Sequence, residues 1–197
     1  MSKQRHTRRS LSSRVRALFT TNRICTVAFD LLESDLEVQT LLEDTNRMAI
    51  DRLGYSDHGH IHSLIVTKNG VELLHALTDA IRPTMVQEGT GTYEDAQLVV
   101  LLASYLHDIG MSIHRERHNE FSVILAIPIV DRVLSTVYPN DRRKQIHVRG
   151  HVLHAIYAHD KLIRPTTMEA GIVGIADALD MTSGRARIPF EAGKVNI

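Results

Sequence analysis

Residues 96–110 of the chain read AQLVVLLASYLHDIG, and the interpretation of the rest depends on this stretch. Its residues are apolar on nearly every side, and a helix of that kind is surrounded by protein on all faces. A histidine and an aspartate, His107 and Asp108, follow the apolar run. Burying such groups is costly unless a partner satisfies them. We therefore expect a buried central helix that ends in a polar pair needing a partner.

The overall composition is that of an ordinary globular protein. The 197 residues suit one domain, and 43% hydrophobic with 23% charged residues excludes disorder, collagen-like repeats and a disulfide scaffold. The single cysteine, Cys25, has no partner within the chain and no secretory signal pattern is present, which favours a cytoplasmic location. No stretch approaches the roughly 20 apolar residues that span a bilayer, so we expect no membrane partner.

Helical periodicity extends over most of the chain. Apolar residues recur every three or four positions from Leu36 to Leu53, with Asp35 at the start and Gly54 as the stop. Further helices are predicted over 61–81, 120–138 with a kink at Pro128, 141–159 and 167–181. Alternating strand patterns are missing before the tail RIPFEAGKVNI, which we expect to be an edge strand or a loop. The sequence predicts an all-α fold.

The charges are unevenly distributed along the chain. Seven of the 23 basic residues precede the first acid, Asp30, so the remainder is acidic. Residues 1 to about 11 have little to bury, and we expect a mobile, solvated arm there, which could also lie against the acidic remainder, with helix from Ser12 onward. We do not expect nucleic acid as a partner, although this basic arm is where it could bind.

Two further polar residues, like His107 and Asp108, lie on stretches that are mostly apolar. Asp177, in GIVGIADALD, lies on a mostly apolar helix, and His62, in HGHIHSLIV, opens another. Imidazoles and carboxylates are ligands for zinc, manganese, iron, cobalt or nickel, and separate helices can bring them together in a bundle core. Taken alone, His107-Asp108 is explained equally well by a hydrogen-bonded histidine and a helix-capping aspartate.

These motifs, taken in order, resemble the HD superfamily of metal-dependent phosphohydrolases. The resemblance rests on His62-Ser63, on the buried helix ending in His107-Asp108, and on Asp177 within Ile-Ala-Asp-Ala-Leu-Asp. It implies that His62, His107, Asp108 and Asp177 hold one metal ion. It also implies that Asp108 is the catalytic residue that bridges to a second ion.

The resemblance covers about residues 55–187 and sets the expected architecture. It implies a single-domain helical bundle of the HD-domain type, with the metal site in its core. We divide the chain into a basic N-terminal arm with the first helix, 1–29, and the HD domain, 30–197. The chain ends without an obvious finishing element, and we expect either that the natural chain continues past Ile197 or that a partner subunit completes it.

Ligands for a second ion are sought among the remaining histidines. His118, ten residues past Asp108, resembles the additional histidine of dinuclear members of the superfamily. The segment of His159, HAIYAHD, together with ADALDMTSGR, is similar to the region preceding the last aspartate in HD-type diadenosine tetraphosphatases and HD-GYP phosphodiesterases, so both histidines are expected to be ligands of a second ion. His151 is the reserve candidate and His154 a poorer one. The carboxylates expected to orient ligating imidazoles are Asp160 and Asp180. The histidines expected to play no part in metal binding are His6, His58, His60, His75, His114 and His147.

The resemblance implies hydrolysis of a phosphomonoester or phosphodiester, with a nucleotide as the expected substrate. One or two divalent transition-metal ions (Mn, Fe, Zn, Co or Ni) would activate hydroxide for attack at phosphorus. Arg185 is the first choice for binding the substrate phosphate, and an ion pair of Arg185 with Asp177 or Asp180 is the alternative. Other cations beside the motifs are Arg115, Arg117, Lys161 and Arg164.

Departures from the relatives limit these implications. Met111 stands where the HD-GYP enzymes have lysine, and no Gly-Tyr-Pro segment follows His159, which disfavours cyclic di-GMP as substrate. Two other functions stay open: a non-catalytic regulatory or ligand-binding module of the same fold, and an oxygen-dependent di-iron enzyme on the same scaffold. The expected partner is a small phosphorylated molecule, and a homo-oligomer stays open.

Overall fold

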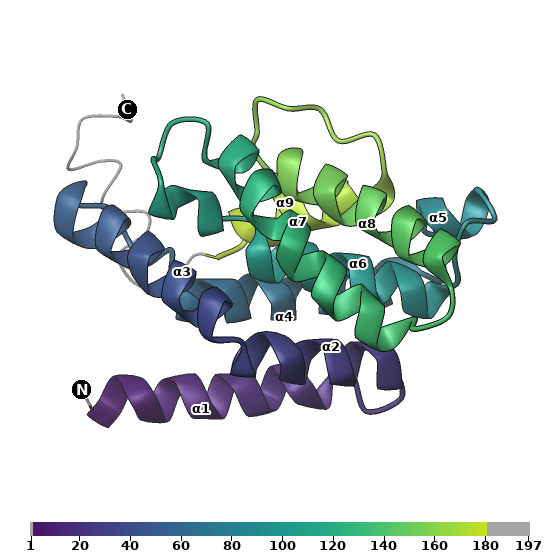
Figure 1. Ribbon diagram of the computed structural model, residues 1–197, viewed down its shortest axis with the longest axis horizontal. Helices are drawn as coiled ribbons and strands as arrows, with labels where there is room; N and C mark the ends of the chain where they lie inside the picture. Colours follow the sequence, from purple (N-terminus) through teal and green to yellow (C-terminus); the bar gives the residue numbers. More distant parts are fainter. Residues whose placement is uncertain (1, 181–197) are drawn as a thin grey trace.

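The computed structural model describes residues 2–180, with side chains from residue 7 onward, and within this range it contains helices and no strands. The all-α prediction is confirmed. None of the described helices has the length and apolar character needed to cross a membrane. In chain order the elements are α1 Ser2–Ala17, α2 Arg23–Ser34, α3 Leu36–Asn46, η1 Arg47–Arg52, α4 His60–Leu77, α5 Thr84–Gln87, α6 Tyr93–Leu106, η2 Ile109–Ser112, α7 His118–Val137, α8 Arg142–Tyr157 and α9 Met168–Ala178 (Figure 1).

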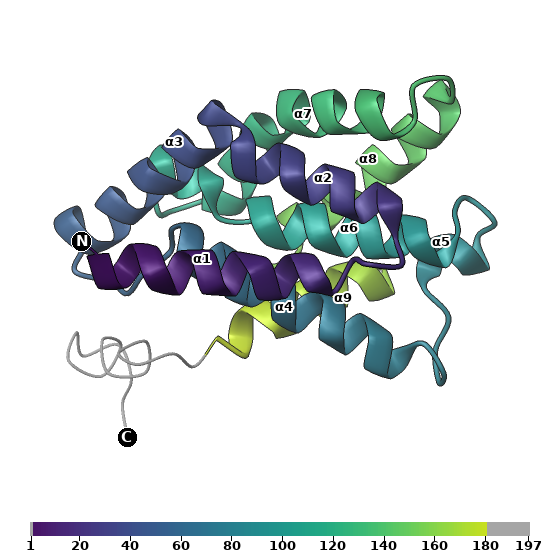
Figure 2. The same ribbon diagram turned by 90° about the horizontal axis from the view of Figure 1, so that it is seen from below.

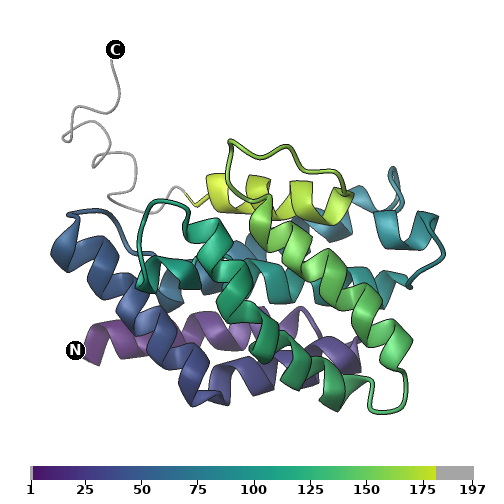
Figure 3. The same ribbon diagram turned by 45° about the horizontal axis from the view of Figure 1, so that its top comes forward.

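Helix α6 forms the centre of the bundle. Every residue from Asp95 to Leu106 is buried, and α2, α4, α8 and α9 pack around the helix (Figures 1 and 3). A capping box starts the helix: the Thr92 hydroxyl accepts from the Asp95 amide, and the Asp95 carboxylate accepts from the Thr92 amide. The C-terminal end of α6, which carries the His-Asp pair, therefore lies deep in the protein.

The basic N-terminal segment is helical from Ser2, and the expectation of a mobile arm up to about residue 11 is wrong. Helix α1 lies along the outer side of α2 and α4 (Figure 2). Arg16 forms a two-bond ion pair with Asp30 at 2.7 Å, and the Ser12 hydroxyl donates to Glu33 at 2.6 Å. Because the acidic partners come from α2, the sequence of the segment alone does not reveal them.

The helix predicted over 36–53 has the expected extent and an unexpected geometry. Asp35 caps α3 by accepting from the amides of Glu37 and Val38, and Gly54 ends the run with φ of 65°. Residues Arg47–Arg52, however, form a π-helical stretch, η1, in which each turn contains more residues than a turn of α-helix. The next helix, α4, ends at Leu77, short of the predicted limit at residue 81.

Candidate metal centre

Six polar residues from different elements meet at the inner end of α6. His62 lies in the first turn of α4, His107 ends α6, and Asp108 immediately precedes η2. His118 begins α7, His159 follows α8 by two residues, and Asp177 lies near the end of α9. All except Asp177 are buried, and the side chain of Asp177 is 29% exposed. The structure thus brings all six sequence-predicted ligand candidates together.

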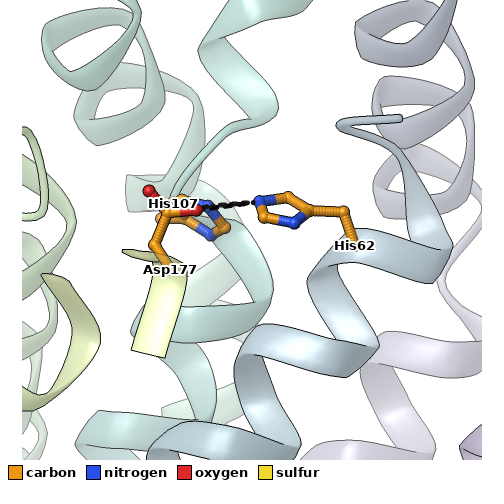
Figure 4. A group of neighbouring side chains, drawn as sticks. All are labelled: His62, His107 and Asp177. Atoms are coloured by element: carbon orange, nitrogen blue, oxygen red, sulfur yellow. Dashed lines mark hydrogen bonds and ion pairs between the residues drawn. The ribbon is translucent and has the colours of Figure 1, made fainter. Parts of the chain in front are cut away.

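The first half of the cluster joins α4, α6 and α9 (Figure 4). His62 Nε2 lies 3.1 Å from His107 Nε2, 3.2 Å from Asp177 Oδ1 and 3.4 Å from Asp108 Oδ2. His107 Nε2 lies 3.3 Å from the same Asp108 oxygen. Four donor atoms therefore surround one small volume.

The second half of the cluster lies on the other side of Asp108. His118 Nε2 is 3.2 Å and His159 Nε2 3.7 Å from Asp108 Oδ1, and the two Nε2 atoms are 3.1 Å apart. Asp108 thus presents Oδ2 to His62 and His107 and Oδ1 to His118 and His159. One carboxylate is shared by two sets of imidazoles.

Backbone carbonyls fix the orientation of two of the rings. His107 Nδ1 lies 2.8 Å from the carbonyl oxygen of Ser104, and His159 Nδ1 lies 2.6 Å from that of Ile156. A carbonyl oxygen can only accept, so each Nδ1 carries a proton and donates it. In the neutral ring, Nε2 then holds a lone pair that points into the cluster.

A carboxylate fixes a third ring. His62 Nδ1 donates to Asp180 Oδ2 at 2.7 Å, and both residues are buried. Such a carboxylate–imidazole pair is the usual support of a metal-ligating histidine. Asp180 lies where it was expected, whereas Asp160 does not: its carboxylate accepts from the Leu162 amide in a turn.

The donor set fits a divalent transition metal. Imidazole nitrogens and carboxylate oxygens bind such ions at about 2.0–2.2 Å, and neighbouring ligands of a four- or six-coordinate ion are then about 3–3.5 Å apart. Most of the donor separations in the cluster fall between 3.1 and 3.4 Å. Two inward Nε2 lone pairs at 3.1 Å would repel one another without a positive charge between them. The cluster therefore requires shared protons or metal ions.

The pKa values of the cluster histidines shift in different directions: burial lowers the pKa of His159 and Asp108 offsets only part of this, whereas the pKa values of His62 and His107 are raised. Burial lowers the pKa of His62, but the carboxylates of Asp108, Asp177 and Asp180 raise it more, to about 10. Burial likewise lowers the pKa of His107, and Asp108 and Asp177 bring it up to about 9.

The carboxylates respond in the opposite direction. Burial raises the pKa of Asp108, yet His107, His118 and His159 hold it well below its usual range. The raised pKa values of His62 and His107 and the lowered pKa of Asp108 describe a half of the cluster that attracts protons, and a bound cation would displace them.

Close packing holds the Asp108 turn against α3 and α7. A Cβ at Gly110 would lie only 2.1 Å from the carbonyl oxygen of His118, and the Gly110 amide donates to Ser122 Oγ at 2.8 Å. On the α3 side, the Thr45 hydroxyl donates to the carbonyl oxygen of Asp108 at 3.4 Å. Sequence reasoning missed Thr45 and Ser122, because their role depends on contacts across 63 and 12 residues.

Apart from His58, whose ring centroid lies 5.4 Å from that of His62, the other histidines of the described chain make their hydrogen bonds and ion pairs outside the six. His151 Nε2 is 3.5 Å from Glu88 Oε2, and His154 accepts from the Thr166 amide, so neither reserve candidate joins the cluster. His75 bonds to Gln97. Arg185, the predicted phosphate ligand, and the tail RIPFEAGKVNI lie outside the described residues.

A helical bundle that gathers four histidines and two aspartates in its interior belongs to the class of proteins built to hold divalent ions between helices. The sequence profile of the HD domain matches residues 59–182, and the chain belongs to the HD domain family. HD domains are typical of metal-dependent phosphohydrolases. The chain is also 43% identical over 163 residues to the uncharacterized protein MJ1020 of Methanocaldococcus jannaschii. That match covers 82% of this chain and 62% of the relative, and no solved structure matches the chain.

Proposed function

We propose that this protein is a metal-dependent phosphohydrolase that cleaves a phosphomonoester or phosphodiester bond of a nucleotide. The observation that carries the proposal is the position of Asp108, whose two oxygens face two separate histidine sets. A carboxylate shared in this way is the arrangement expected for a pair of adjacent ions. Pairs of ions are suited to displacement at phosphorus, because both attacking and leaving oxygens can be stabilised.

Each half of the cluster has a defined part in the proposal. His62, His107 and Asp177 would hold one ion together with Asp108 Oδ2, and His118 and His159 would hold the other with Asp108 Oδ1. When bound, such ions lower the pKa of water and polarise phosphoryl oxygens.

The protein's own groups supply orientation and access. Asp180 and the carbonyls behind His107 and His159 hold the rings in the tautomer that leaves Nε2 available. Asp177 is the partly exposed member of the six, and a small phosphorylated molecule would approach the ions from its side.

The test pairs elemental analysis with a substrate screen. The purified full chain is analysed for transition metals and assayed against phosphomonoesters, phosphodiesters and nucleotides with added manganese. We expect bound metal and hydrolysis of at least one phosphate ester. Asp108→Asn, which keeps the side-chain shape, should lose both, while His75→Ala, on the exposed side of α4 and bonded to Gln97, should lose neither.

Three results would contradict the proposal. A metal-free protein that is inactive across the screen would instead favour a regulatory or ligand-binding module. Iron content coupled to oxygen uptake, without phosphate release, would favour oxygen-dependent chemistry. Full activity in Asp108→Asn would show that the shared carboxylate is not needed.

A further inference from the structure

Arg115 lies beside the second half of the cluster. It belongs to the loop between η2 and α7 and is partly buried. Its Nη1 atom lies 2.8 Å from Nδ1 and 3.2 Å from Nε2 of His118. The guanidinium group is therefore about one hydrogen-bond length from the nitrogen that faces Asp108 Oδ1.

Arg115 contacts His118 through its guanidinium group, and the carboxylate behind that ring is Asp108. Among the described residues no acidic group lies within ion-pair distance of Arg115. Its neighbour Arg117 differs, because that guanidinium forms a two-bond pair with Glu120 on the protein surface. Other arginines also form ion pairs with carboxylates, as Arg132 does with Asp35 and Arg149 does with Asp131. Within residues 7–180, the guanidinium of Arg115 thus bonds to an imidazole and is not ion-paired with a carboxylate, which leaves it able to bind an anion.

The contact between Arg115 and His118 competes with the ligand role of His118. His118 Nδ1 lies 3.0 Å from the carbonyl oxygen of Arg115 as well as 2.8 Å from its guanidinium. A neutral ring nitrogen either donates or accepts, and a guanidinium only donates. If Nδ1 donates to the carbonyl oxygen, as the ligand tautomer requires, the guanidinium loses its acceptor on that atom.

We propose that Arg115 binds a phosphate group of the substrate at the half of the site formed by Asp108 Oδ1, His118 and His159. The planar guanidinium fork matches two phosphate oxygens, and a phosphate there would form the direct ion pair that no described carboxylate forms with Arg115. Turning from His118 toward this anion frees the imidazole for its ligand role. The inference rests on the proposed function, since it assumes a phosphate-containing ligand.

The experiment measures binding of inorganic phosphate to the manganese-loaded full chain by titration calorimetry. Arg115→Gln should raise the Kd for phosphate about 10-fold to 100-fold, the size expected for a charged hydrogen-bonded contact. Arg115→Lys should show a smaller rise, because lysine keeps the charge and loses the fork. Arg117→Gln is the matched control, two residues away and exposed, and should bind phosphate as the unmodified protein does.

Manganese content is measured for every variant and separates a binding role from a structural one. Arg115→Gln should retain its manganese, since removing a cation beside His118 does not disfavour a metal ion. Unchanged phosphate affinity in Arg115→Gln, loss of affinity only together with manganese, or no phosphate binding by the unmodified protein would each overturn the inference. If phosphate binding depends on Arg115 while no phosphate ester is hydrolysed, the proposed function fails and this inference stands.

Discussion

Replacing Gly110 with alanine tests whether the packing of η2 against α7 creates the second half of the metal centre. The added Cβ would lie 2.1 Å from the His118 carbonyl oxygen, 2.3 Å from the Ser122 amide nitrogen and 2.8 Å from the Phe121 carbonyl carbon. All three are backbone atoms, which cannot rotate away as a side chain can. To reach even a 3.0 Å contact, the start of α7 must move about 1 Å from the Asp108 turn.

That displacement has two measurable consequences. Overpacking a well-packed interior costs about 1–3 kcal/mol, and losing the bond from the Gly110 amide to Ser122 costs about 1 kcal/mol more, so we expect a loss of about 2–4 kcal/mol in the free energy of unfolding. Metal–ligand distances tolerate only about 0.2 Å of error. Because His118 would move by several times that amount relative to Asp108, manganese binding by this half of the cluster should fail.

Urea denaturation and metal analysis measure these effects. The matched control is Gly150→Ala on α8, where nothing lies within 4 Å of the added Cβ and alanine favours the helix by about 0.5–1 kcal/mol. Gly110→Ala should lower the urea midpoint and the manganese content, while the control should raise the midpoint and keep the metal. Unchanged stability together with full metal content in Gly110→Ala would refute the packing argument.

Three further predictions concern the surroundings of the centre. Asp180→Asn weakens the support of His62 Nδ1 and should raise the Kd for manganese about 10-fold to 100-fold, measured by titration. When the free manganese concentration is about 100 times its Kd, removing the metal with a chelator should lower the Tm by about 5–10 °C. An unchanged Tm would argue against a metal site that stabilises the fold. Burial raises the pKa of Glu33, but bonds from His60, Ser12 and Tyr105 lower it to about 2. The ionised Glu33 therefore stabilises the fold fully above its unfolded pKa near 4.5, and this stabilisation disappears as pH falls through about 2. The difference in the free energy of unfolding between the unmodified protein and Glu33→Gln should accordingly shrink as the pH is lowered from about 4.5 to about 2.

Local sequence signals were sufficient for most of the helices. Periodicity and capping residues such as Asp35 and Gly54 act within one or two turns, so they can be read without knowing the fold. The π-helical end of the 36–53 helix was not predictable in this way, and neither was the helical start of α1. Packing and ion pairs with other elements decide both, as the Arg16–Asp30 pair shows for α1.

The candidate ligands could be chosen from the chain because polar groups on apolar helices are conspicuous. His107, Asp108 and Asp177 stand out for this reason, and the resemblance to the HD superfamily added His118 and His159. The expected supporting role of Asp160 failed, because that carboxylate closes a local turn instead of reaching His159. Which acid reaches which ring depends on how the ends of α8 and α9 are placed.

The linear chain therefore specified an all-helical protein with a buried group of imidazoles and carboxylates, since hydrophobic period and residue type are properties of neighbouring positions. Three features arose only on folding: the division of that group between the two oxygens of Asp108, the support of His62 by Asp180, and the contact of Arg115 with His118. These features join residues as far apart as 118 positions, and their geometry is set by how α7 packs on η2 and how α9 packs on α4 and α6.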